Sequence, residues 1–227
     1  RQTQDLKKNL INNNIFDEKK VILLHDAILN IEDFKNKKIN GSANLINEIQ
    51  DGFFLTVGRF TKQKNHIYLI TEFEKFLTLY PNEKLVLIGE GELKKKMQRI
   101  IKKKKLSNNI FLIDYTENVY FYMKKSKALV LTSLWEDPGF VIIEAALCNT
   151  TIISSNCKNG PKEFLLNGRA GLIFENNKEN ELLKKLEEFK KLEKNDIFKK
   201  KLLAKKNSAK FTMFRHYLSL NKIIQTS

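Results

Sequence analysis

Short apolar runs alternate with longer segments of helical periodicity along most of this chain. The apolar runs predict strands at residues 21–24, 53–57, 84–88, 110–113, 128–132, 151–154 and 171–174. Apolar residues at helical spacing predict helices at residues 5–12, 65–80, 92–105, 119–125, 139–147 and 161–166. From residue 178 the pattern is helical to the end, with breaks near Asn195 and Phe211, and residues 41–51 predict a surface connection. This alternation is typical of an α/β fold with a parallel sheet flanked by helices, here with extra C-terminal helices.

Polar or glycine-containing clusters follow five of the predicted strands directly. They are Gly58-Arg59, Gly89-Glu90-Gly91, Asp114-Tyr115, Glu136, and residues 159–163. Because α/β proteins bind ligands in the crevice outside the carboxyl ends of their strands, these clusters predict one binding site there. The glycine pair at 89 and 91 predicts a tight turn close to a ligand and not a dinucleotide fingerprint. Lys94 stands where a third small residue is needed, and Glu90 and Glu92 would repel a pyrophosphate.

Two acids, Glu136 and Glu144, lie eight positions apart at this predicted crevice. Glu136 follows the strand at 128–132, and Glu144 lies about a turn and a half into the next helix. One carboxylate can accept hydrogen bonds from both hydroxyls of a ribose, which suits Glu144. Glu136, with the amides near Gly139 and Phe140 at the helix start, suits a sugar ring or a phosphate. The alternative is that Glu136 caps the helix and Glu144 is solvated.

The loop after the strand at 53–57 carries a glycine and two cations, Gly58, Arg59 and Lys64. A guanidinium and an ammonium on one loop can hold a diphosphate from two sides, the first as a planar fork and the second as a point charge. The same charges would stabilise a departing diphosphate as its negative charge develops. Two solvated surface bases would give the same pattern, so the loop alone leaves both interpretations open.

The formal net charge of +15 raises the question of an anionic partner. Only five of the 41 basic residues are arginines, and the lysines fall in runs typical of solvated surfaces. A stacking platform for single-stranded nucleic acid requires aromatic residues interleaved with the basic ones, and these runs contain no such interleaving. We therefore expect no nucleic-acid partner, and a basic nucleic-acid-binding domain is the least favoured alternative. Contact with an anionic membrane surface stays open.

Length, cysteines and metal motifs limit the remaining classes. The 227 residues, 42% of them hydrophobic, can build a substantial core, and no apolar run is long enough to span a bilayer. Cys148 and Cys157 predict free thiols in a reducing cytoplasm, and the start at Arg1 suggests a fragment boundary. No Asp-x-Asp motif and no His/Cys cluster with metal spacing occurs, so we expect no metal and no other cofactor. The expected location is cytoplasmic, with a peripheral position at the inner membrane face as an option.

From about Val21 to its end, the chain resembles the C-terminal half of GT-B-fold retaining glycosyltransferases of family 4. The resemblance rests on five ordered motifs, at residues 57–65, 87–93, 109–118, 133–146 and 159–172. It implies a Rossmann-like domain that binds a nucleotide-sugar donor. It further implies metal-independent transfer of the sugar, with retained configuration, to a glycan or lipid-linked acceptor in cell-envelope polysaccharide or glycolipid synthesis.

The resemblance also implies a role for each matching residue. Arg59 and Lys64 match the pair that holds the donor diphosphate, and Glu136 matches the acid that faces the transferred sugar. These three are the expected catalytic residues. Glu144 matches the carboxylate on the ribose hydroxyls.

Five further positions complete the donor site implied by the resemblance. The amides near Gly139 and Phe140 match the loop that contacts sugar or phosphate. Tyr115 lies where the strand end of the family flanks the nucleobase. Gly58 and Gly89 form the turns beside the donor.

Asp137 and Pro138 replace a glycine and an aromatic residue of the usual motif, which leaves the sugar undetermined. Asp114 stands at a position where members of the family often have glycine, which leaves the nucleobase of the donor undetermined.

A GT-B enzyme has two Rossmann-like domains with the active site between them, and the acceptor-binding domain has no counterpart in this sequence. We expect residues 1–20 to enter the domain, residues 21–210 to form it, and residues 211–227 to form a helix that packs toward the first domain. The isolated domain is expected to turn over little or nothing. A non-catalytic nucleotide-sugar-binding module is the alternative from another class.

Overall fold

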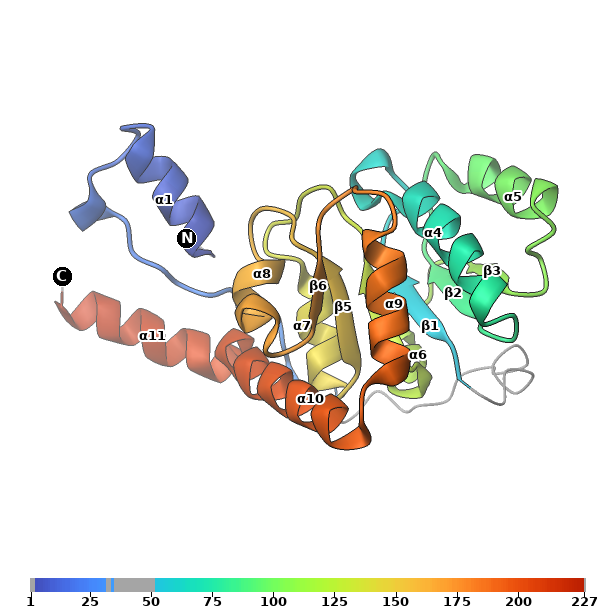
Figure 1. The fold of residues 1–227 in the computed structure, drawn as a ribbon. Coiled ribbons are helices and arrows are strands. Elements are labelled where there is room, and N and C mark those ends of the chain that lie inside the picture. The colour runs from blue at the N-terminus through green and yellow to red at the C-terminus, as the bar shows by residue number, and fades with distance from the viewer. Residues whose placement is uncertain (1–2, 32–33, 35–51, 227) are drawn as a thin grey trace.

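Six parallel strands form one sheet in the computed structural model, which describes residues 3–31, 34 and 52–226. In spatial order β3-β2-β1-β4-β5-β6, the strands span Ile110–Ile113, Leu85–Ile88, Phe54–Val57, Ala128–Leu131, Thr151–Ser155 and Leu172–Phe174 (Figure 1). Every neighbouring pair is parallel. The Rossmann-like fold class is therefore confirmed. The strand order changes direction between β1 and β4, and ligands of such sheets bind at this switch point.

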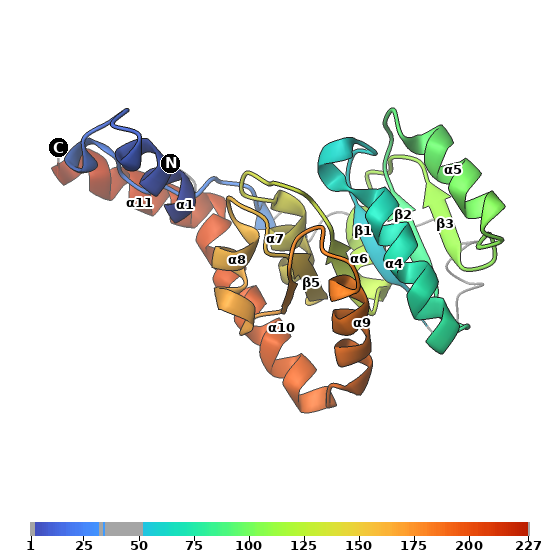
Figure 2. The same ribbon diagram turned by 45° about the horizontal axis from the view of Figure 1, so that its top comes forward.

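Helices cover both faces of the sheet. One face packs against α4 (His66–Leu79), α5 (Lys94–Lys103) and α9 (Glu181–Lys191). The other packs against α6 (Val119–Lys125), α7 (Phe140–Leu147) and α10 (Lys194–Ser208) (Figure 2). Alternate residues of β2 join opposite clusters, with Leu85 and Leu87 on one face and Val86 and Ile88 on the other. Because both faces are buried, the strands read in the sequence as continuous apolar runs.

The remaining elements lie before, between and after these layers. They are α1 (Gln4–Asn12), α8 (Pro161–Phe164), α11 (Met213–Thr226), and the 3-10 turns η1 (Glu18–Lys20), η2 (Lys62–Lys64), η3 (Leu166–Gly168) and η4 (Ala209–Phe211). Both views show α11 running away from the sheet (Figures 1 and 2). The extra C-terminal helices are therefore confirmed.

One predicted strand is wrong, and one predicted helical break lies slightly before its expected position. Residues 21–24 form no strand. The segment that they begin contacts the C-terminal part of the chain instead, where the Ile28 and Leu29 amides donate to the Phe211 carbonyl and Leu29 forms an isolated bridge with Thr212. The helical break expected near Asn195 is present at Leu192 and Glu193, and α10 begins at Lys194. The surface connection at 41–51 lies outside the described residues.

Two other sequence features can be compared with the structure directly. Cys148 and Cys157 are free cysteines, as predicted, and both are buried. Burial raises the pKa of the Cys148 thiol to about 12, so this thiol stays protonated at neutral pH. In the described part of the chain, no helix is long and apolar enough to cross a membrane.

Candidate functional site

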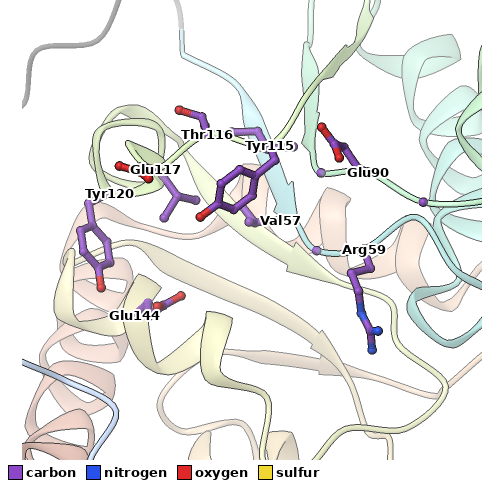
Figure 3. Close-up of a pocket in the computed structure, with 13 residues that line it drawn as sticks. Val57, Arg59, Glu90, Tyr115, Thr116, Glu117, Tyr120 and Glu144 are labelled. Carbon is purple, nitrogen blue, oxygen red and sulfur yellow. The ribbon is translucent and has the colours of Figure 1, made fainter.

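A cleft of about 890 Å³ opens at the carboxyl edge of the sheet, at the switch point (Figure 3). Its walls come from the ends of β1 and β2, the segment after β3, the start of α6, and α7. The lining residues are Val57, Gly58, Arg59, Ile88, Gly89, Glu90, Gly91, Tyr115, Thr116, Glu117, Val119, Tyr120 and Glu144. Five of the nine predicted donor-site residues are thus brought together from four separate parts of the sequence.

Glycines occupy three of the cleft positions where β1 and β2 end, namely Gly58, Gly89 and Gly91. A Cβ atom on Gly89 would lie 2.1 Å from the Gly58 carbonyl oxygen, and one on Gly91 would lie 2.6 Å from the Phe60 carbonyl oxygen. Neither approach is sterically possible, so both positions require glycine. These glycines therefore allow the segments after β1 and β2 to pack directly against each other at the edge of the cleft.

Charges are unevenly distributed in the cleft. Arg59 is the only cation among its described lining residues, whereas Glu90, Glu117 and Glu144 are acids. Arg59 lies on the side opposite Tyr120 and Glu144, and the Tyr120 hydroxyl points toward the helix that carries Glu144 (Figure 3). The arrangement suits an elongated ligand with an anionic group at one end and hydroxyl groups at the other.

Lys64 and Glu136 do not line this cleft but form a largely buried ion pair beside it. The Lys64 ammonium donates to Glu136 Oε1 at 2.6 Å, and the side chains are 16% and 5% exposed. The Ser133 hydroxyl donates to the same carboxylate oxygen. A Cβ atom on Gly58 would lie 3.5 Å from Lys64 Cε, so the pair adjoins the cleft directly behind that glycine. Lys64 offsets the charge that Glu136 brings into the interior.

Gly139 and Phe140 lie at the start of α7 next to this ion pair. Gly139 is the N-cap residue with φ of 87°, a left-handed conformation that favours glycine. A Cβ atom there would lie 3.5 Å from Glu136 Cγ, and the Phe140 side chain is 43% exposed. The predicted site residues therefore form two adjoining groups, one in the cleft and one around Glu136.

Several lining residues were missed by sequence reasoning. Thr116 and Glu117 extend the polar cluster that follows β3, so the rule that polar residues gather after strands could have found them. Tyr120 lies in α6 within an apolar stretch, and its local sequence gives no sign of a site.

Tyr115 is 71% exposed, so its ring stands at the open edge of the cleft. Among the described residues, no cluster of His, Cys, Asp and Glu could hold a metal ion.

His66 begins α4 directly after the Lys64 turn and is 2% exposed. Burial, reinforced by the nearby Lys64 charge, lowers the pKa of His66 to about 3. The imidazole is therefore neutral at pH 7 and packs edge-on against Phe60, with ring centroids 5.3 Å apart. His66 supports the loop that carries Lys64.

Protonation of His66 is expected to make stability fall in acid. The folded-state pKa is below the unfolded value of about 6.5, so between these values the unfolded chain binds more protons. This contribution is fully present above pH 6.5 and is lost by about 1.4 kcal/mol for each pH unit below it. Urea unfolding of the wild type and His66→Phe from pH 7.5 to 4.5 measures the difference in slope. His216→Gln is the control, and equal slopes in the wild type and His66→Phe would contradict the prediction.

Comparison with known proteins agrees with this fold and shows the family of the chain. A family model described as glycosyl transferases group 1 matches residues 42–210, and the chain belongs to this family. An uncharacterised glycosyltransferase of Methanocaldococcus jannaschii is 42% identical over 52% of this chain and 30% of its own length. An N-acetylgalactosaminyltransferase of Campylobacter jejuni, which acts on a diphospho-undecaprenol substrate by its name, is 31% identical over 79% of this chain and 47% of its own. The chain thus spans less than half the length of these relatives.

Solved structures share the fold at low sequence identity. HepE of Anabaena in complex with UDP superposes with a TM-score of 0.85 at 15% identity, over 100% of this chain and 63% of HepE. A glycosyltransferase of Rickettsia africae gives a TM-score of 0.83 at 19% identity, over 97% and 61% of the two chains. The domain thus corresponds to part of larger GT-B glycosyltransferases, with the C-terminal half as the matching region.

Proposed function

We propose that this chain is the donor-binding domain of a retaining glycosyltransferase. It binds a nucleoside-diphosphate sugar and, with an acceptor-binding domain, transfers the sugar to a glycan or lipid-linked acceptor of the cell envelope. The observation that carries the proposal is the cleft at the switch point, with Arg59 on one side and Glu144 on the other. The UDP complex of HepE and the diphospho-undecaprenol substrate named for the Campylobacter relative support it.

The two cations are assigned to the diphosphate. Arg59 reaches it from the cleft, and Lys64 reaches it from behind Gly58. An ammonium has three N–H donors, so the bond of Lys64 to Glu136 leaves donors for a phosphate oxygen. When the bond between the sugar carbon and the diphosphate oxygen breaks, the leaving group gains negative charge, which both cations stabilise.

The acids are assigned to hydroxyl groups. Glu144 accepts from the ribose hydroxyls, with Tyr120 on the same side of the cleft. Glu136 orients the transferred sugar beside the backbone amides at Gly139 and Phe140, at the start of α7. Tyr115 at the open edge covers the nucleobase.

Calorimetric titration with UDP, GDP and ADP tests donor binding. The proposal predicts saturable binding of one of the three nucleotides with a stoichiometry of about one. No binding of any nucleotide by the full-length protein would contradict it. Sugar transfer by the full-length protein then separates an enzyme from the alternative, a non-catalytic nucleotide-sugar-binding module.

Glu144→Gln is expected to weaken nucleotide binding by about 10-fold, because one charge-assisted hydrogen bond to the ribose is lost. A 2′-deoxy nucleotide should bind the wild type about as weakly as the ribonucleotide binds Glu144→Gln. In Glu144→Gln the deoxy nucleotide and the ribonucleotide should bind with equal affinity. Calorimetry on these four combinations measures the coupling. Glu117→Gln, a second acid of the cleft, is the matched control and should retain discrimination against the deoxy nucleotide. If Glu144→Gln prefers the ribonucleotide over the deoxy nucleotide as strongly as the wild type does, the ribose assignment is contradicted.

A further inference from the structure

A second groove of about 720 Å³ lies between η3, α10 and α11 and shares no lining residue with the cleft. Four exposed cations line it. Arg169 follows η3, Lys206 comes from α10, Lys210 from η4, and Arg215 from α11. In both views α10 and α11 form an outer edge of the molecule (Figures 1 and 2). The groove is therefore accessible from solvent.

The positive charge of this groove is not offset locally. No Asp or Glu is among its described lining residues, and in the described part of the chain none of the four cations forms an ion pair. By contrast, several lysines elsewhere are paired, as Lys127 is with Glu83 at 2.7 Å. Concave surfaces lined by one sign of charge concentrate counter-ions. The groove thus attracts anions.

The choice of basic residue points to phosphate. The chain has 41 basic residues and only five arginines, yet two of these five, Arg169 and Arg215, line this groove. The guanidinium group matches phosphate oxygens in a bidentate geometry that an ammonium cannot provide. Arginine in a chain so biased toward lysine therefore favours a phosphate ligand over general surface charge.

Exposed apolar side chains accompany the cations. Leu203 lines the groove and is 38% exposed, and α10 also exposes Phe198 (59%) and Leu202 (54%). Lys199 and Lys205 lie exposed on the same helix. Exposed apolar side chains beside polar and basic ones mark surfaces that contact a partner or a membrane. A free phosphate compound without an apolar part would not contact these apolar side chains.

We propose that this groove docks the domain onto an anionic phospholipid surface. The lipid phosphates lie between Arg169 and Arg215, Lys206 and Lys210 add attraction, and Leu203 contacts the acyl boundary. The docking does not depend on nucleotide binding in the cleft. It brings a domain assigned to nucleotide-sugar binding next to the membrane, where lipid-linked acceptors reside.

Cosedimentation of the full chain with phosphatidylglycerol vesicles tests the docking surface. Each basic residue near such a surface contributes about five-fold to binding, so Arg169→Gln/Arg215→Gln should bind about 25-fold more weakly. The matched control is Lys102→Gln/Lys103→Gln, which has the same net charge. These exposed lysines end α5, which lies far from α11 in both views. Salt screens charges at that distance, so the control should bind within about two-fold of the wild type.

Three outcomes would overturn the proposal. Equal weakening in both double variants would show that net charge alone drives vesicle binding. Equal binding of neutral phosphatidylcholine vesicles would exclude recognition of the lipid charge. Saturable binding of glycerol phosphate that only the arginine variant loses, without vesicle binding, would assign the groove to a free phosphate compound. Nucleotide affinity measured on the same samples should be unchanged, which shows that each variant is folded.

Discussion

Arg59→Ala is expected to weaken binding of the preferred nucleoside diphosphate by about 10- to 150-fold, because charge-assisted hydrogen bonds contribute about 1.5–3 kcal/mol each. Arg59 is the only cation among the described residues that line the cleft, so no other side chain there can replace it. The loss should depend on the phosphates. Calorimetry with the diphosphate and the corresponding nucleoside measures this, and the nucleoside should bind the variant and the wild type equally.

Lys62→Ala is the matched control for Arg59→Ala. Lys62 is exposed in the same loop and lines no part of the cleft. Its removal lowers the net charge by the same amount and should change diphosphate affinity by less than about three-fold, since exposed charges are screened. If both variants weaken binding equally, the loop acts through general charge and the assignment of Arg59 is wrong.

Lys64→Met is expected to destabilise the fold by about 3–5 kcal/mol and to abolish sugar transfer. The change leaves Glu136, which is 5% exposed, as a buried charge with its cation removed. Removing the second charge as well, in Lys64→Met/Glu136→Gln, should restore most of the stability, because Ser133 can still donate to the amide oxygen. Transfer should not return in the double variant, since the cation for the diphosphate is still missing. Urea unfolding and a transfer assay on the full-length protein measure the two effects separately.

Lys94→Met provides the comparison for this ion pair. Lys94 pairs with Asp114 at the surface, where the two side chains are 29% and 66% exposed. Exposed ion pairs contribute about 0–1 kcal/mol, so this variant should unfold almost like the wild type. The buried-pair interpretation fails if Lys64→Met costs no more than Lys94→Met, or if the double variant recovers no stability.

The sheet could be predicted from the sequence because its strands are buried on both faces. Each of the six is a short apolar run, and period and length suffice to recognise them. The run at residues 21–24 is similarly apolar but pairs with no strand among the described residues, and the apolar pattern does not say whether a partner exists. Helix ends were less well defined, as the break at Leu192 shows.

The sequence could predict only those cleft residues that a local pattern marks. Gly58, Gly89 and Tyr115 follow strands directly, and topology brings strand ends together. The contact between Lys64 and Glu136 joins residues 72 positions apart, and no local pattern indicates that they pair with each other. Tyr120 was missed for a related reason, because an aromatic residue in an apolar stretch usually belongs to the core. Side-chain pairing across the fold needs three-dimensional coordinates.

A crystal structure of the full chain with its preferred nucleoside diphosphate tests the central claim most directly. The claim predicts the diphosphate within hydrogen-bonding distance of Arg59 and Lys64, the ribose hydroxyls at Glu144, and the base beside Tyr115. The nucleotide should lie in the cleft at the switch point between β1 and β4. A nucleotide bound instead between Arg169 and Arg215, or with its ribose at Arg59 and its phosphates at Glu144, would contradict the assignment of the donor site.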